Sequence, residues 1–206
     1  MSDPVVIVDY GICNIDSVAR AVEECGGRAV VTSDGRGLHN ATRIILPGVG
    51  AFPDGMRNLR DLGLLDPLRE QVVGRSVPTL GICLGMQLLA STGVEVTSTA
   101  GLDWIPGEIR RLEPTETDPR VPHIGWNELI VEQDSPLLRG ISSGTDFYFV
   151  HSYHLSPSTE GDVVARTPYC GGFASVVQRK NVFGVQFHLE KSQRPGFQVL
   201  RNFLAL

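Results

Sequence analysis

The chain of 206 residues carries 18 Lys+Arg against 23 Asp+Glu, a formal net charge of −5, and its length suits one compact domain or at most two small ones. An acidic balance without a basic stripe disfavours a nucleic-acid binder, and 42% hydrophobic against 20% charged residues excludes a globally disordered chain. No apolar run approaches the roughly 20 residues that span a bilayer, and the first residues lack the basic region of a signal peptide, so we expect a cytoplasmic protein without a membrane partner.

The first half of the chain alternates strand and helix patterns. Residues 4–9 form a short apolar run, typical of a buried parallel strand. Hydrophobic side chains then recur with helical spacing, at Ile15, Val18, Ala19 and Val22, before a Gly-Gly pair that ends the helix. We further predict strands at 28–32, 43–47 and 77–82, and helices at 54–73 (broken near Gly63 and Pro67) and 84–90. Strands separated by helices indicate a parallel sheet with covered faces.

After about residue 100 the pattern changes to strands divided by Gly, Pro and Asn turns. The predicted strands are 104–113, 124–132, 147–155, 162–167 and 173–187. A last helix, 193–206, places four apolar side chains on one face: Phe197, Leu200, Phe203 and Leu204. No repeat or linker divides the chain, so we expect residues 1–206 to form a single domain whose β-rich second half extends or covers the same sheet.

Four cysteines stand at positions 13, 25, 83 and 170, and none has the spacing of a zinc or thioredoxin-type site. We expect Cys13, Cys25 and Cys170 to be small buried thiols in a reducing compartment. Cys83 differs, because residues 81–85, Gly-Ile-Cys-Leu-Gly, have the form G-x-nucleophile-x-G between a buried strand and an apolar helix. That is the context of a nucleophile elbow, in which the helix N-terminus favours the thiolate and the amide of Leu84 stabilises an oxyanion. A buried cysteine in an ordinary turn is the alternative.

A thiol nucleophile needs a base and a group that orients the base. Of the five histidines, only His188 has a carboxylate two residues on, at Glu190. Residues i and i+2 of an extended segment share a face, so Glu190 would hold the imidazole while His188 takes the proton. A surface pair is the commoner origin of this spacing, and His151 is a rival base.

A second oxyanion donor is expected where residues 47–50, Pro-Gly-Val-Gly, end a predicted strand. If the strands are parallel, this turn lies at the same carboxyl edge as Cys83, where ligands of open α/β sheets bind. Its glycines allow close approach to a ligand, and Val49 and Gly50 are the candidate donors. The turn alone is a weak signal, but it converges with the elbow and the His-x-Glu pair.

Together these segments resemble the class I (triad-type) glutamine amidotransferases, and among them the glutaminase subunits of imidazole glycerol phosphate synthase. The matching pieces extend over essentially the whole chain: residues 9–11 with Asn14, 47–52, 81–89, 125–127, 148–153 and 187–192. Pro-Gly-Val-Gly-Ala-Phe favours the histidine-pathway subunits over anthranilate-type (P-G-P-G) and pyridoxal-phosphate-type (P-G-G-E) relatives. The resemblance implies a flavodoxin-like α/β fold, with a mostly parallel sheet, helices on both faces and an added β-rich half.

By this resemblance, Cys83 attacks the side-chain amide of L-glutamine, forms a γ-glutamyl thioester and releases ammonia. His188 would act as base and then acid, with Glu190 orienting it. Four further residues would hold the amino-acid end of the substrate: Gln87, Glu95, and the backbone of Ser152 and Tyr153. The resemblance implies neither a cofactor nor a metal.

It also implies a partner, a (β/α)₈-barrel cyclase subunit that receives the ammonia and makes imidazole glycerol phosphate and AICAR in histidine biosynthesis. Four residues match the docking face for this subunit: Asn14, Trp126, Tyr148 and Lys191. The isolated chain should hydrolyse glutamine poorly. Because Val49 lies between two glycines, its peptide can rotate, and its amide need not point inward until the partner docks.

The chain departs from the family pattern at three places. Leu189 stands in the late His-x-Glu motif where Pro is usual; this leaves the backbone freer, and we expect its side chain to face away from the triad. Cys13 precedes Asn14 where Gly is usual, and His123 and Ile124 precede Gly-Trp-Asn where a Met is common.

Three other functions remain open on the sequence. One is an amidotransferase subunit serving another synthase, for instance one that aminates a sugar precursor. Another is a non-catalytic or thiol-sensing elbow protein, which the intact His188–Glu190 pair argues against. The third is a cysteine version of an α/β-hydrolase, in which the acid precedes the histidine; here the order is Cys83, His188, Glu190.

Overall fold

Strands from both halves of the chain combine into one large sheet in this computed structural model, which describes residues 4–206. The elements of the first half are β1 (Pro4–Val8), α1 (Ile15–Glu24), β2 (Arg28–Thr32), β3 (Arg43–Gly48), α2 (Phe52–Asp61), α3 (Leu65–Arg69), β4 (Thr79–Cys83) and α4 (Leu84–Leu88). Those of the second half are β5 (Thr92–Gly93), β6 (Thr99–Ala100), β7 (Gly107–Arg111), β8 (His123–Val131), β9 (Thr145–His151), β10 (Tyr153–Pro157), β11 (Val163–Thr167), β12 (Phe173–Arg179), β13 (Val182–Val185) and α5 (Gln193–Leu204).

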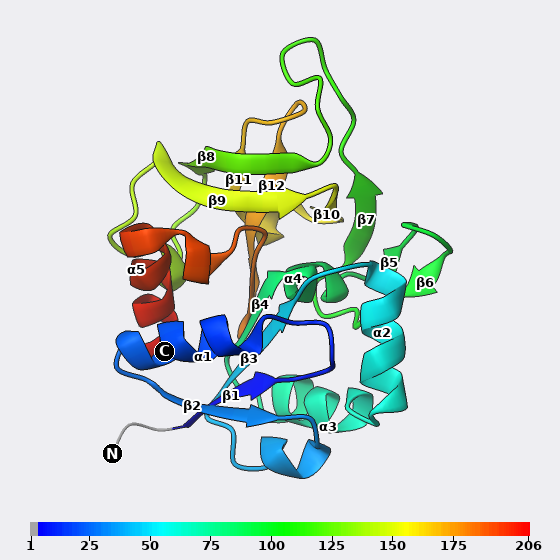
Figure 1. Cartoon of the computed structure of the whole chain (residues 1–206), viewed down its shortest axis with the longest axis vertical. Coiled ribbons are helices and arrows are strands. Elements are labelled where there is room, and N and C mark those ends of the chain that lie inside the picture. Colours follow the sequence, from blue (N-terminus) through cyan, green and yellow to red (C-terminus); the bar gives the residue numbers. More distant parts are fainter. Residues whose placement is uncertain (1–3) are drawn as a thin grey trace.

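The large sheet has nine strands in the order β2-β1-β3-β4-β13-β12-β11-β8-β9. The strands from β2 to β13 run parallel, and the four strands from β12 to β9 extend the sheet with antiparallel pairs. A second sheet of four strands, β10-β7-β5-β6, stands beside it (Figure 1). The predicted α/β fold with a mostly parallel sheet is therefore confirmed, and the β-rich half both extends the main sheet and forms a second one.

Both faces of the inner parallel strands β1, β3, β4 and β13 are largely buried, because helices cover each face, whereas the edge strand β2 is partly exposed. Val5 and Ile7 of β1 face an apolar cluster that includes α1 and α5, whereas Val6 and Val8 face a cluster that includes α2, α3 and α4. Figure 1 shows α1 and α5 together on one side and α2 and α3 on the other. No helix within residues 4–206 is both long and apolar enough to cross a membrane.

Two predicted strands are each divided in two. The strand predicted at 147–155 breaks at Ser152, because β9 pairs in the main sheet and β10 crosses to pair with β7 in the second sheet. The strand predicted at 173–187 is a hairpin, which turns at Lys180 (φ 54°) and Asn181. The short strands β5 and β6 had no sequence signal, since each has two residues.

The helical stretch predicted at 54–73 ends and restarts near Gly63, whose φ of +65° is outside the helical range. The second predicted break, at Pro67, is wrong. Pro67 lies in the first turn of α3, where a missing amide N–H costs no helical hydrogen bond. A π-helical turn at Glu70–Gly74 continues the chain toward β4.

The expectation for the cysteines is also corrected. Cys83 is buried, at 6% exposure, but Cys13, Cys25 and Cys170 are only half-buried. These three lie in loops at the ends of elements, where the thiols of Cys25 and Cys170 approach backbone carbonyls at 3.5 and 3.6 Å.

Candidate active site

Cys83 is the last residue of β4, and α4 begins at the next residue, Leu84. Its backbone has φ 53° and ψ −109°, a conformation that costs energy for a residue with a side chain. The flanking glycines allow this turn. A Cβ on Gly81 would lie 2.6 Å from the Gly85 carbonyl oxygen, and a Cβ on Gly85 would overlap the carbonyl oxygen of Leu46. The segment therefore has the strand–turn–helix geometry that an elbow requires.

The Pro-Gly-Val-Gly turn lies beside this elbow. In the parallel pair of β3 and β4, Gly48 is the register partner of Cys83, so both strands end at the same edge. The amide of Val49, however, donates a hydrogen bond of 2.9 Å to the carbonyl oxygen of Ile12. Gly50 follows with φ +101°, which only glycine adopts readily. The Val49 donor is thus engaged with the loop after β1 rather than free.

His188 and Glu190 form a buried pair, with Nδ1 of His188 2.8 Å from Oε1 of Glu190. Two hydrogen bonds hold the backbone of His188 in place and so position its side chain. The His188 N–H donates to the Tyr148 carbonyl, and the Ser192 hydroxyl donates to the His188 carbonyl at 2.6 Å. The side chain of Leu189 is 1% exposed and packs in the core, so it does face away from this pair.

The imidazole of His188 is strongly basic in this setting. Burial alone would lower its pKa, but hydrogen bonding to Cys83 and Glu190 and the negative charges of both raise it to about 10. Within residues 4–206, the buried Nε2 of His188 has no hydrogen-bond partner other than the Cys83 thiol. Nε2 is therefore the ring nitrogen of His188 that faces Cys83, while Glu190 holds Nδ1.

His151, the rival base, is occupied on both ring nitrogens. Its Nδ1 lies 2.9 Å from the Tyr153 carbonyl oxygen, which can only accept, so Nδ1 carries the proton. Its Nε2 then accepts from Nδ1 of His123 at 3.3 Å, and Nε2 of His123 accepts from the Asn127 amide at 3.3 Å. Burial lowers the pKa of His151 to about 3. Neither nitrogen is open to serve Cys83.

A cavity of about 360 Å³ opens over Cys83. The predicted nucleophile, base, oxyanion and substrate residues all line it: Val49, Gly50, Cys83, Leu84, Gln87, Glu95, Ser152, Tyr153 and His188, together with Val150 and His151. Glu190 does not line the cavity, because it stands behind His188. The structure therefore brings together residues that are more than one hundred positions apart in the chain.

Gln87 and Glu95 are held by contacts that the sequence did not indicate. The amide nitrogen of Gln87 donates to the Tyr153 carbonyl at 2.8 Å and to the Gln186 side-chain oxygen at 3.1 Å. An oxygen of the Glu95 carboxylate accepts from the Phe52 backbone amide at 2.6 Å, and the Tyr153 hydroxyl donates to the Glu95 carbonyl at 3.3 Å.

Sequence reasoning missed Gln186, whose amide nitrogen lies 3.7 Å from the sulfur of Cys83. A signal was present: Gln186 stands two residues before His188 in an extended segment, and alternate residues share a face. Tyr10 was also missed. Among residues 4–206 its buried hydroxyl finds no hydrogen-bond partner, and burial, with the charges of Cys13 and Cys83, raises its pKa well above the ordinary value.

Three of the four predicted interface residues form one surface group. The rings of Trp126 and Tyr148, which are register partners on β8 and β9, meet edge to face at 5.9 Å. The Lys191 ammonium lies 5.8 Å from the centre of the Tyr148 ring. Trp126 remains 48% exposed. Asn14 lies at the N-terminus of α1.

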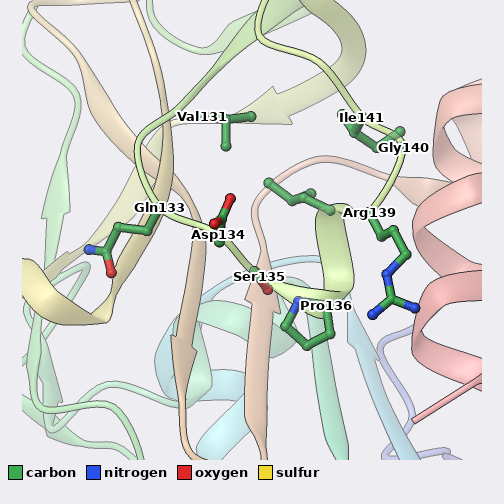
Figure 2. Close-up of a pocket in the computed structure, with 9 residues that line it drawn as sticks. Val131, Gln133, Asp134, Ser135, Pro136, Arg139, Gly140 and Ile141 are labelled. Atoms are coloured by element: carbon green, nitrogen blue, oxygen red, sulfur yellow. The ribbon is translucent and has the colours of Figure 1, made fainter.

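A second cavity, of about 480 Å³, shares no lining residue with the first. It lies in the loop after β8, and its two charged side chains, Asp134 and Arg139, are exposed. Figure 2 shows them on different sides of the hollow. Since it is lined by neither histidine nor cysteine, this cavity carries no chemistry comparable to that around Cys83.

Comparison with known proteins decides the family. The family model described as "Glutamine amidotransferase class-I" matches residues 6–206. The chain belongs to this family of amidotransferases. The amidotransferase is 50% identical over 200 residues to "Imidazole glycerol phosphate synthase subunit HisH" of Moorella thermoacetica, an alignment that covers 97% of this chain and 93% of that protein.

A second relative is "Imidazole glycerol phosphate synthase subunit HisH 2" of Nitrobacter winogradskyi, 45% identical over 205 residues and 97% of both chains. Among solved structures, one described as "Crystal structure of glutamine amidotransferase" superposes with a TM-score of 0.76 at 20% identity, covering 98% of the amidotransferase and 99% of that chain. The structural likeness confirms the fold of the amidotransferase.

Proposed function

We propose that this chain is the glutaminase subunit of imidazole glycerol phosphate synthase and releases ammonia from L-glutamine for a (β/α)₈-barrel cyclase subunit in histidine biosynthesis. The observation that carries the proposal is that Cys83 and His188 line one cavity while Glu190 pairs with His188 from behind, in a chain 50% identical to a HisH subunit. The open Nε2 of His188 supports its role as the base, because Glu190 already holds Nδ1.

In the proposed reaction the Cys83 thiol gives its proton to Nε2 of His188, and the sulfur attacks the side-chain amide carbon of glutamine. A C–S bond forms and negative charge moves to the amide oxygen. His188 then returns the proton to the amide nitrogen, the C–N bond breaks, and ammonia leaves a γ-glutamyl thioester. A water molecule next gives a proton to His188 and attacks the thioester; the C–S bond breaks, glutamate leaves, and the thiol regains its proton.

The amino-acid end of the substrate would lie at the other lining residues of the cavity. The Glu95 carboxylate suits the α-ammonium group, and Gln87 supplies its side-chain oxygen, because its nitrogen is already used. Backbone groups of Ser152 and Tyr153 would contact the α-carboxylate side. These assignments rest on the cavity that the four residues line together.

The oxyanion donors would be the amides of Leu84 and Val49, with Gly50 as the flexible neighbour. Leu84 is the first residue of α4, so its amide has no partner within the helix. The Val49 amide is bonded to the Ile12 carbonyl and must leave it before it can bind an oxyanion. We therefore expect low glutaminase activity in the free chain, and activation when the docked partner turns this peptide inward.

The docking face would include Trp126, Tyr148 and Lys191, with Asn14 at the start of α1. The exposed indole of Trp126 and the neighbouring Tyr148 ring are of the residue types enriched at interface centres, and the Lys191 ammonium lies over the Tyr148 ring. Val49, 42% exposed, lies on the loop that a partner would have to move.

The test is glutamate release from glutamine by the whole chain, alone and with the cyclase partner and its nucleotide ligand. We expect release only with both, and a fall of at least about 10³-fold in Cys83→Ala, because the thiol is the nucleophile. Crystals of the free and the partner-bound chain would check the Val49 peptide, and an inward amide in the free chain would contradict the gating.

Other outcomes would redirect the proposal. Full activity without the cyclase partner would indicate another synthase or a glutaminase that acts alone. Activity that survives Cys83→Ala would remove Cys83 as nucleophile. No release under any condition would favour a non-catalytic protein that binds through the elbow.

A further inference from the structure

Gln186 contacts the sulfur of Cys83 from a position that the proposed mechanism does not use. It is fully buried between the end of β13 and His188, and its Nε2 lies 3.7 Å from Cys83 Sγ. A buried carboxamide is costly unless its donors and acceptor find partners, so its placement against a sulfur calls for an explanation.

The neighbouring hydrogen bonds decide which end of this carboxamide faces the sulfur. Gln87 must present its nitrogen to the Tyr153 carbonyl, because a carbonyl oxygen can only accept. The same nitrogen lies 3.1 Å from Oε1 of Gln186, which therefore accepts. The nitrogen of Gln186 is then left to face Cys83. The chain of bonds fixes both carboxamides in one orientation and makes Gln186 a donor to the sulfur.

We propose that Gln186 is a further catalytic residue, whose side-chain N–H donates to Cys83 Sγ and stabilises the thiolate independently of His188. The inference rests on the proposed function, in which the thiol proton moves from sulfur to Nε2 of His188. When that S–H bond breaks, the Gln186 bond becomes a charge-assisted one, roughly twice as strong as a neutral one. Burial strengthens it further, because water does not compete.

The expected effect has two opposed parts. Removing the donor would shift the midpoint of the Cys83 rate–pH profile upward by about one unit, so that about tenfold less thiolate is present below the midpoint. The thiolate that does form would be more nucleophilic by about threefold, since nucleophilicity rises with basicity at a Brønsted slope of about 0.4–0.5. The variant would therefore be about threefold slower below the midpoint and about threefold faster on the high-pH plateau.

The experiment measures the rate at which iodoacetamide alkylates Cys83 in the whole chain over a range of pH. Peptide mass spectrometry quantifies the alkylated Cys83. Gln186→Met keeps the side-chain length and removes the donor. Gln178→Met is the matched control, because Gln178 lies on the other strand of the same hairpin and bonds Ser135 instead. Both variants are checked by circular dichroism and thermal melting.

Other ionisable groups around Cys83 stay unchanged in all variants: His188 and Tyr10 beside it, Glu190 behind His188, and Glu95, His151 and Tyr153 around the cavity. We expect only the rate–pH profile of Gln186→Met to cross that of the wild type, slower at low pH and faster at high pH. A merely structural loss would slow alkylation at every pH. Should Gln186→Met fail to fold, Gln186→Glu tests the same inference. It keeps an oxygen for Gln87 and places negative charge at the sulfur, so its midpoint should rise further.

A folded Gln186 variant with the midpoint of the wild type would overturn the inference. The proposed function is judged separately by glutamate release. If release does not require Cys83, the proposed function fails and the Gln186 inference with it. If release requires Cys83 but Gln186→Met and Gln178→Met share one midpoint, only the Gln186 inference fails.

Discussion

At the residue scale, His123 and His151 are ordered by their neighbours into one chain of donors and acceptors. The Asn127 amide donates to His123, His123 donates to His151, and His151 donates to the Tyr153 carbonyl. Phe149 and Tyr169 stack on the His123 ring at 4.9 and 4.0 Å. Each neutral imidazole thus has its one donor and one acceptor satisfied, whereas a protonated ring would bring two donors face to face.

This arrangement predicts acid sensitivity. Burial lowers the pKa of His123 to about 4 and that of His151 to about 3, from an ordinary value of 6.5. As pH falls through 6.5 the unfolded chain takes up protons that the folded chain refuses, so the stabilisation present above pH 6.5 is lost progressively down to about pH 3. Urea unfolding of the wild type and of His123→Met between pH 7.5 and 4.5 measures this loss of stability. The variant should lose less stability on acidification, and parallel curves would contradict the prediction.

Leu189 predicts a separation of stability from activity. Its side chain is fully packed in the core, whereas the His188–Glu190 pair is held by backbone and Ser192 contacts that do not involve it. Leu189→Ala should therefore lower the free energy of unfolding by about 2–5 kcal/mol. Glutamate release, measured well below the melting temperature, should stay near the wild-type rate. A large fall in kcat in a folded variant would show that Leu189 positions Glu190.

At the scale of elements, the close crossing of α4 over β3 and β4 depends on one missing methyl group. A Cβ on Gly85 would overlap the Leu46 carbonyl, and backbone cannot move aside as a flexible side chain can. Gly85→Ala should therefore destabilise the fold by several kcal/mol, at the upper end of single substitutions. Gly74→Ala is the matched control, since its nearest neighbour would be the Glu70 side chain at 4.0 Å. Thermal melting of both variants checks this, and equal melting temperatures would contradict it.

Local hydrophobic patterns in the sequence correctly predicted the strands and helices that stay within one sheet or one layer along their whole length. Strand 28–32 was predicted with its observed bounds, because its apolar run begins and ends within a single sheet. The division at Ser152 could not be predicted, since residues 147–155 keep the same alternation while the strand passes from one sheet to the other.

The same distinction applies to the site. The spacing of His188 and Glu190 was readable because two residues of an extended segment share a face. The contact of Gln186 with Cys83, and that of His123 with His151, join separate strands of the fold. Such partners are set by sheet order and register, which local sequence does not specify.

For the whole molecule, the cavity lies where the two sheets meet. Cys83 belongs to the nine-stranded sheet, Tyr153 begins a strand of the four-stranded sheet, and Ser152 connects them. Gln87 bridges the two by bonding the Tyr153 carbonyl and Gln186. Binding of glutamine would thus tie the sheets together, and its release would loosen them.

On warming, activity should then be lost at a lower temperature than secondary structure. A small separation of the sheets would pull Tyr153 from Gln87 and open the substrate site while each sheet kept its own hydrogen bonds. We expect the temperature of half-inactivation to lie below the midpoint seen by far-ultraviolet circular dichroism, with saturating glutamine narrowing the gap. Coincident midpoints with and without glutamine would contradict this. The Ser152–Tyr153 peptide, which is proposed to contact the substrate, would then also join the two sheets. The enzyme would therefore be most rigid when glutamine is bound.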